Sequence, residues 1–155
     1  MEKPKVHLRK AQSSDMEAVL SLIKELAVYE KAGHEVTNTV ANLIEDGFGD
    51  EPIFKCIVAT NEDIVIGFAL YYTSYSTWKG KCLYLEDFLV TESWRRKGVG
   101  KLLFDEVFRI AKETDARRFE WQVLDWNQPA INFYKKYKAN MDETWINCKL
   151  MLASE

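Results

Sequence analysis

The sequence is poor in the features that mark several protein classes. Only 3 of its 155 residues are proline and 47% are hydrophobic, which argues against a disordered chain and predicts a packed core. The longest apolar run, residues 64–72, is too short to span a bilayer. A formal net charge of −3 disfavours nucleic acid as the main partner and suits a cationic small molecule. We therefore expect a globular protein with neither a membrane nor a nucleic-acid partner.

Cysteine and histidine are also scarce. Cys56, Cys82 and Cys148 are odd in number and widely spaced, so we interpret them as buried free thiols in a reducing compartment. His7 and His34 stand alone, which gives a structural zinc site little support. Residues 1–5 do not resemble a cationic-then-apolar leader. We expect a cytoplasmic protein without a metal site.

Hydrophobic periodicity predicts one domain, residues 1–155, that contains both helices and strands. The first helix begins with a capping box formed by Ser14 and Glu17. The helices are predicted over residues 14–30, 38–45, 101–111 and 129–137, and the strands over residues 6–9, 54–59, 64–75, 81–90, 119–124 and 144–152. This order predicts an α/β fold with a central mixed sheet flanked by helices.

The run Arg95-Arg96-Lys97-Gly98-Val99-Gly100 lies between a predicted strand and a predicted helix. Glycines let the backbone approach a phosphate, and the first N–H groups of a helix lack internal partners. The helix dipole and three cationic side chains add positive potential at the same place. No hydroxyl follows Lys101, as a P-loop would require, and the three-glycine dinucleotide fingerprint is missing. The run predicts a phosphate-bearing ligand, although the pattern alone also fits a basic loop before a helix.

A second motif spans residues 126–134, where the strand predicted at 119–124 gives way to a helix. Asn127 is placed to cap that helix, and Ala130 and Tyr134 share one of its faces. Such a face could hold an extended ligand, with the Tyr134 hydroxyl at one end.

Together, Arg-x-x-Gly-x-Gly at residues 95–100 and Asn-x-x-Ala-x-x-Phe-Tyr at residues 127–134 resemble the two cofactor motifs of the GNAT superfamily of N-acetyltransferases. Residues 67–72, 75–81, 84–88 and 124–128 resemble the spermidine/spermine (diamine) acetyltransferase family, and its thialysine acetyltransferase branch is especially similar. The resemblance implies the GNAT acyl-CoA N-acyltransferase fold, with acetyl-CoA as cosubstrate between two splayed parallel strands. It also implies a homodimer.

The resemblance carries roles onto particular positions. It implies that acetyl-CoA is bound by Phe88, Leu89 and Val90, by Arg95, Arg96, Lys97, Gly98, Val99, Gly100 and Lys101, and by Asn127, Gln128, Pro129, Ala130 and Tyr134. The acceptor amine would face Tyr29, Glu30, Glu86, Glu120, Trp121 and Gln122. Lys138 stands where the family usually has a glycine, which puts the end of that helix in doubt. The tail after Asn140 is shorter than the family leads us to expect, which leaves the acceptor open.

The predicted chemistry needs a base and an acid. A primary amine with a reference pKa of about 10.4 is mostly protonated at neutral pH and cannot attack a thioester until it loses a proton. Glu86 is the candidate base, and a regular strand would turn its neighbour Asp87 to the opposite face. Tyr134 keeps its proton at neutral pH and is the candidate acid for the departing thiolate.

These residues predict transfer of an acetyl group from acetyl-CoA to a small cationic amine, either a di- or polyamine or a lysine-like amino acid such as thialysine. Attack would be direct, in a ternary complex, because no cysteine sits in an evident nucleophile setting. Two alternatives remain: an acetyltransferase that acts on a protein N-terminus or lysine, and a non-catalytic acyl-CoA sensor. The single residues also have plainer interpretations, with Tyr134 as a packing aromatic, Glu86, Glu120 and Gln122 as surface groups, and Tyr29 and Glu30 as a solvated helix end.

Overall fold

The computed structural model describes residues 5–152, and the chain divides between Gln122 and Val123 into two compact units. The first unit contains strands β1 (His7–Lys10), β2 (Lys55–Asn61), β3 (Ile64–Ser76), β4 (Gly80–Val90) and β5 (Arg118–Glu120). Its helices are α1 (Met16–Tyr29), α2 (Val40–Phe48) and α3 (Val99–Glu113), with short 3₁₀ turns η1 (Ser13–Asp15), η2 (Gly33–Glu35) and η3 (Glu92–Trp94). The second unit contains helix α4 (Gln128–Lys135).

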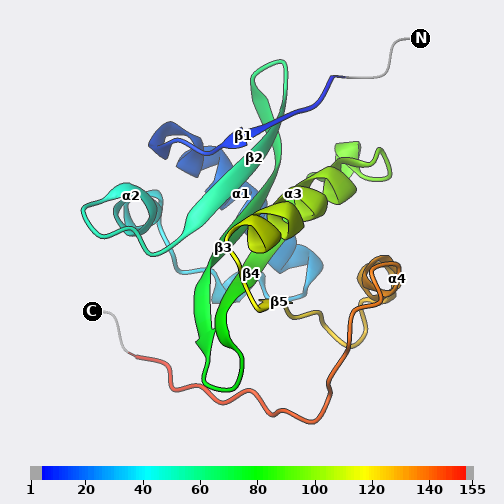
Figure 1. Cartoon of the computed structure of the whole chain (residues 1–155). Coiled ribbons are helices and arrows are strands. Elements are labelled where there is room, and N and C mark those ends of the chain that lie inside the picture. Colours follow the sequence, from blue (N-terminus) through cyan, green and yellow to red (C-terminus); the bar gives the residue numbers. More distant parts are fainter. Residues whose placement is uncertain (1–4, 153–155) are drawn as a thin grey trace. The chain divides into compact units, whose positions relative to one another are not determined.

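The first unit is built on one five-stranded sheet with the order β1-β2-β3-β4-β5 (Figure 1). Consecutive strands from β1 to β4 pair antiparallel, whereas β5 pairs parallel to β4 through the crossover of α3. The predicted mixed sheet flanked by helices is therefore confirmed.

Helices cover both faces of this sheet, with α1 behind it and α3 in front in Figure 1. On the α1 face, Met16 and Val19 pack in one buried cluster with Phe68 and Leu70 of β3. α3 is buried through Leu103, Phe104 and Val107, among others. Gly67 allows this close packing, because a Cβ there would lie 2.8 Å from the Leu89 carbonyl oxygen and 3.2 Å from Leu103 Cδ1.

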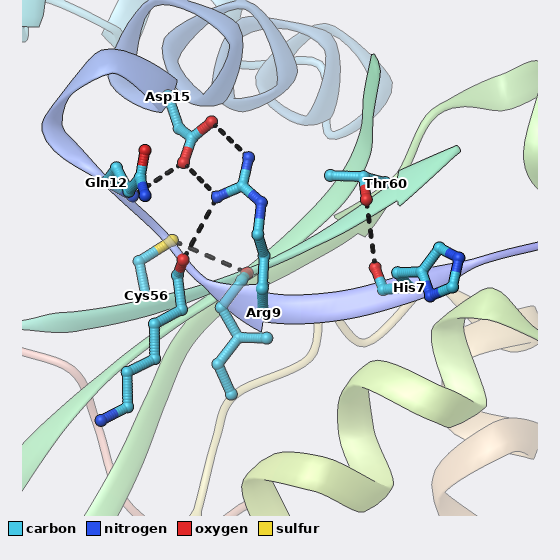
Figure 2. Close-up of polar contacts among 8 residues, drawn as sticks. His7, Arg9, Gln12, Asp15, Cys56 and Thr60 are labelled. Atoms are coloured by element: carbon cyan, nitrogen blue, oxygen red, sulfur yellow. Dashed lines mark hydrogen bonds and ion pairs between the residues drawn. The ribbon is translucent and has the colours of Figure 1, made fainter. Parts of the chain in front are cut away.

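The entry to α1 is fixed by a buried carboxylate, shown in Figure 2. Asp15 accepts hydrogen bonds from Arg9 Nη1 at 2.7 Å and Nη2 at 2.9 Å, and from the Gln12 backbone N–H at 2.7 Å. The predicted capping box is wrong in its residues. α1 begins at Met16, so Ser14 lies inside the 3₁₀ turn and Asp15 accepts the bond that closes the turn.

Two predicted strands differ from the observed ones. The strand expected over residues 119–124 is limited to Arg118–Glu120. The final strand expected over 144–152 does not form, and its apolar side chains are exposed, with Ile146 at 86% and Leu150 at 90%. A strand needs a hydrogen-bonded neighbour, and among the described residues the second unit offers none. No helix among residues 5–152 combines the length and apolarity needed to cross a membrane.

Candidate active site

β4 contains a β-bulge at Glu86, the residue predicted to be the general base. Leu70 of β3 pairs with Asp87 and Tyr71 pairs with Leu85, which leaves Glu86 as an extra residue without a partner in the ladder. Asp87 therefore shares a face with Leu70, which packs in the α1 cluster, and Glu86 accepts a hydrogen bond from Tyr72 of the same face. The expectation that Asp87 points away from Glu86 is wrong, because it assumed a regular strand.

This face of the sheet carries a concentration of negative charge. Burial, followed by the charges of Glu86 and Glu30, raises the pKa of Asp87 to about 7. Burial also raises the pKa of Glu30, which directly follows α1. We call the set of ionisable side chains that act on one another here the acidic face. Its members are Glu30, Tyr72, Tyr84, Glu86, Asp87 and Glu120.

Two tyrosines belong to the acidic face. Tyr72 and Tyr84 are directly paired across β3 and β4, and their ring centroids lie 5.4 Å apart. Burial and the Glu86 carboxylate raise the pKa of Tyr72 to about 12, and the same two causes raise the pKa of Tyr84. Tyr72 therefore keeps its proton at neutral pH, and its hydroxyl donates a hydrogen bond to the Glu86 carboxylate.

The structure brings only some of the predicted acceptor residues to this face. Glu120 pairs with Tyr84 in the ladder and forms an ion pair of 2.7 Å with Arg118. Trp121 instead packs its ring against Phe104 of α3 and against Phe119, with centroids 5.0 Å away in each case. Gln122 is exposed at the end of the first unit. Apolar packing against α3 thus takes Trp121 away from the acidic face.

Beyond its bulge, β4 extends past its parallel neighbour. The β4–β5 ladder ends at the Tyr84–Glu120 pair, while β4 continues to Val90 and stays paired with β3. Phe88 contacts Phe104 of α3, with ring centroids 5.9 Å apart, and Leu89 and Val90 are buried. The predicted cofactor residues of β4 therefore lie where the two strands no longer pair.

The glycine turn, which we define as residues 95–100, leads directly into α3. Gly98 precedes the helix with a φ of 82°, a left-handed conformation that glycine adopts without a Cβ penalty. The first N–H groups of α3, from Val99 to Lys101, have no carbonyl one turn earlier in the helix. A Cβ on Gly100 would lie 3.8 Å from Val90 Cγ2 and 3.9 Å from Phe88 Cε2, so the turn sits beside the end of β4. This geometry suits an anion.

The basic side chains of the glycine turn and of Lys101 each make different contacts. Arg95 Nε donates to the Val90 carbonyl oxygen at 3.0 Å, and its Nη2 pairs with Glu25 at 3.3 Å. The Lys97 ammonium lies 4.9 Å from the Trp94 ring centroid. Lys101 forms an ion pair with Asp105, one turn along α3. Arg96 has a φ of 62°, where many backbones would use glycine.

The second predicted cofactor motif, residues 127–134, forms helix α4 and its N-terminal cap. The Asn127 side chain accepts a hydrogen bond from the Ala130 N–H at 3.4 Å, which confirms it as the helix cap. Pro129 lies in the first turn, and Gln128 donates to Asn132 at 2.8 Å. Tyr134 is the buried side chain of the helix. After α4, Lys138 takes a φ of 58°, the left-handed conformation expected of the missing glycine.

The rest of the described chain offers no competing catalytic constellation. Residues 5–152 include no cluster of three or more histidine, cysteine, aspartate or glutamate side chains suited to a metal ion. Cys56 and Cys82 are buried as predicted, but the prediction is wrong for Cys148, which is exposed in the segment where the expected final strand does not form. Burial raises the pKa of the Cys56 thiol to about 12, which suppresses the nucleophilic thiolate. A pocket of about 480 Å³ near Arg9, Tyr71 and Arg109 contains none of the predicted site residues.

Sequence reasoning missed Tyr72, Tyr84 and Glu25 as parts of this region. A signal existed for the tyrosines, because counting back through the β3–β4 hairpin places Tyr72 opposite Tyr84. Tyr84 and Glu86 are two residues apart, which also favours a common face. No local pattern marked Glu25, whose partners lie 66 to 70 residues further along the chain.

Comparisons with known proteins find similar sequences and a similar fold among acetyltransferases. The model of the acetyltransferase (GNAT) family matches residues 17–138. The mouse thialysine N-epsilon-acetyltransferase is 38% identical over 151 residues, covering 90% of this chain and 89% of the relative. Human spermidine/spermine N(1)-acetyltransferase-like protein 1 is 38% identical over 148 residues, which cover 89% of this chain but only 21% of that longer protein. An aminoglycoside N-acetyltransferase solved in complex with CoA shares the fold, with a TM-score of 0.76, 18% identity and coverage of 97% of this chain and 98% of that one.

Proposed function

Since the chain belongs to the acetyltransferase (GNAT) family, we propose that it transfers the acetyl group of acetyl-CoA to a primary amine of a small cationic acceptor. The acceptor class is a di- or polyamine or a lysine-like amino acid such as thialysine. The observation that carries this proposal is the acidic face, where carboxylates from β4, from β5 and from the residue that follows α1 gather around paired tyrosines. Relatives named for thialysine and for spermidine and spermine support the same acceptor chemistry.

The acidic face would do two things to the acceptor. Its negative charge attracts a protonated amine and selects against neutral or anionic substrates. Glu86 then takes a proton from the amine, directly or through one water, and frees the lone pair that attacks the thioester carbonyl. Tyr72 holds this carboxylate through its hydrogen bond of 3.2 Å.

The cofactor would lie along the open edge of β4 and the N-terminus of α3. The N–H groups of residues 99–101, with the positive charges of Arg96 and Lys97, would supply donors and positive potential for the pyrophosphate. We also assign Asn127, Gln128, Pro129 and Ala130 to the binding of the cofactor. Tyr134 would give its proton to the CoA thiolate as the tetrahedral intermediate collapses, which leaves the acetylated amine as product.

Attack would be direct, in a ternary complex of enzyme, acetyl-CoA and amine. Cys56 and Cys82 are both buried, and burial raises the pKa of the Cys56 thiol, which makes Cys56 a poor nucleophile for a covalent acetyl-enzyme. We also propose a cytoplasmic homodimer. The exposed apolar side chains of Trp145, Ile146 and Leu150 support the dimer as surface that association would cover.

An amine panel with acetyl-CoA tests the function directly. We expect release of free CoA thiol with polyamines or thialysine, and little release with neutral amines of similar size. Glu86→Gln and Tyr134→Phe should each lower kcat by roughly 10²-fold or more, the range of a lost general base or acid, with CoA affinity little changed. Glu51→Gln, a change at an exposed carboxylate outside the acidic face, is the matched control and should leave kcat unaltered.

The two alternatives give different results in the same assay. Tight acetyl-CoA binding without thiol release from any amine would favour a sensor. Thiol release with peptides but not with small amines would favour a protein acceptor. Either outcome would overturn the proposal.

A further inference from the structure

We propose that Arg95 is a positioning residue: with Glu25 it clasps the start of the glycine turn to the acceptor-side end of α1, in place of a direct contact with the pyrophosphate. This inference rests on the proposed function, because it assigns work to the turn that would hold the cofactor. We call the set of Glu25, Tyr29, Val90, Thr91 and Arg95 the clasp.

The donors of Arg95 are directed into the first unit. Its Nε donates to the Val90 carbonyl oxygen at 3.0 Å, and its Nη2 donates to Glu25 Oε1 at 3.3 Å. The guanidinium also lies over the Tyr29 ring, 5.4 Å from the centroid. Because a guanidinium is planar, these three contacts together fix its orientation.

Glu25 completes the clasp from the side of the helix. Its Oε2 accepts from the Thr91 hydroxyl at 3.0 Å, and its Oε1 accepts from the Glu92 backbone N–H at 3.0 Å as well as from Arg95. Both oxygens of the carboxylate are therefore engaged. The side chains of Arg95 and Glu25 are only 35% and 31% exposed, and the carboxylate offsets the charge that Arg95 could otherwise offer a phosphate.

The clasp connects the proposed cofactor site with the proposed amine site. On one side it holds Val90 and Thr91, where β4 ends and the chain turns toward Gly98 and the helix N-terminus. On the other side it holds Glu25 and Tyr29, which lie four residues apart on α1. Tyr29 directly precedes Glu30, whose charge acts on Asp87 in the acidic face. The clasp thus sets the spacing between the cofactor turn and the amine site.

The variant Glu25→Gln distinguishes a positioning role of Arg95 from a direct contact with the pyrophosphate. If Arg95 bound the pyrophosphate, Glu25→Gln would release it and remove a nearby negative charge, so CoA would bind at least as tightly as before. If the clasp holds the turn, Glu25→Gln weakens CoA binding and raises KM for both acetyl-CoA and amine. We expect a rise of roughly tenfold in each KM, the value of one hydrogen bond to a charged group, with kcat changed less than threefold.

Arg95→Lys provides a second discriminating variant. A lysine keeps the positive charge but cannot donate to Val90 and Glu25 in the fixed geometry of a guanidinium. We expect Arg95→Lys to be as impaired as Arg95→Gln, and the double variant Arg95→Gln/Glu25→Gln to be no worse than either single change. An Arg95→Lys enzyme with normal CoA affinity, or additive losses in the double variant, would overturn the clasp.

The experiment combines calorimetry with CoA and steady-state kinetics with acetyl-CoA and the best amine, with thermal unfolding to verify folding. Glu17→Gln, at an exposed position in the first turn of α1, is the matched control and should change neither KM. If the unaltered protein releases no thiol, the proposed function fails. If it turns over normally while Glu25→Gln binds CoA tightly, only the clasp fails.

Discussion

The Tyr72 hydroxyl donates a hydrogen bond of 3.2 Å to the Glu86 carboxylate, from β3 to the bulge in β4. The bulge turns Glu86 out of the ladder, and the neighbouring strand supplies the donor that orients its carboxylate. The proposed base is thus held by Tyr72, a residue that the sequence analysis did not select.

Tyr72→Phe should lower kcat several-fold. The variant removes the donor that orients the Glu86 carboxylate, so the proposed base is held less well in the position from which it takes the proton of the amine. Tyr84→Phe is the matched control, because it removes a hydroxyl from the paired ring and leaves the Tyr72–Glu86 bond in place. Steady-state kinetics of both variants measure the effect, and an unchanged kcat in Tyr72→Phe would contradict the role given to this bond.

Asp87→Asn should stabilise the protein in a pH-dependent way. Burial and the charges of Glu86 and Glu30 raise the pKa of Asp87 to about 7, so the folded state binds more protons than the unfolded state between about pH 4 and pH 7. Stability is therefore lost as the pH rises through this window. The asparagine variant should be more stable at pH 8 by at least about 1 kcal/mol, and the difference should vanish near pH 4. Chemical denaturation at both pH values measures it, and a pH-independent difference would contradict the prediction.

Asp15→Asn should have the opposite pH dependence. The hydrogen bonds from Arg9 hold the pKa of Asp15 below its usual range against the opposing effect of burial, and the Gln12 N–H adds to the lowering. This stabilisation is present above the ordinary aspartate pKa and is lost as the pH falls through the lower folded value. We expect a loss of about 2 kcal/mol at pH 7 and a much smaller one near pH 2. Asp50→Asn, an exposed position, is the control for a change of net charge.

Lys138→Gly should stabilise the chain by roughly 0.5–1 kcal/mol. Lys138 adopts a φ of 58°, a left-handed conformation that costs a side-chain-bearing residue about 1 kcal/mol and glycine almost nothing. Lys136→Gly provides the contrast, because Lys136 has a φ of −63° and ψ of −24° and glycine there should destabilise. Thermal unfolding of both variants would test the pair. Changes of the same sign would show that backbone strain does not govern this corner.

Much of the fold could be predicted because periodic burial leaves a local trace. The apolar alternation of β3 and the stripe through Leu103 and Val107 follow from which face each element buries. The cap at Asn127 and the turn at Gly98 were also visible, because single residues satisfy local backbone demands. The strand expected over 144–152 was wrong, because alternation reports a preference and not the presence of a pairing partner.

The sequence by itself determined which chemical groups this protein possesses: a glycine turn with positive charge, a capped helix with a phenol, and carboxylates near the end of a strand. Only the tertiary structure decided that Glu86 and Asp87 share a face, that Trp121 packs under α3, and that Arg95 is bound to Glu25. The physical reason is the sequence separation between the residues that interact. Helix caps and turns depend on neighbours a few residues away, whereas a bulge register or an ion pair between α1 and the glycine turn depends on segments that only folding brings together.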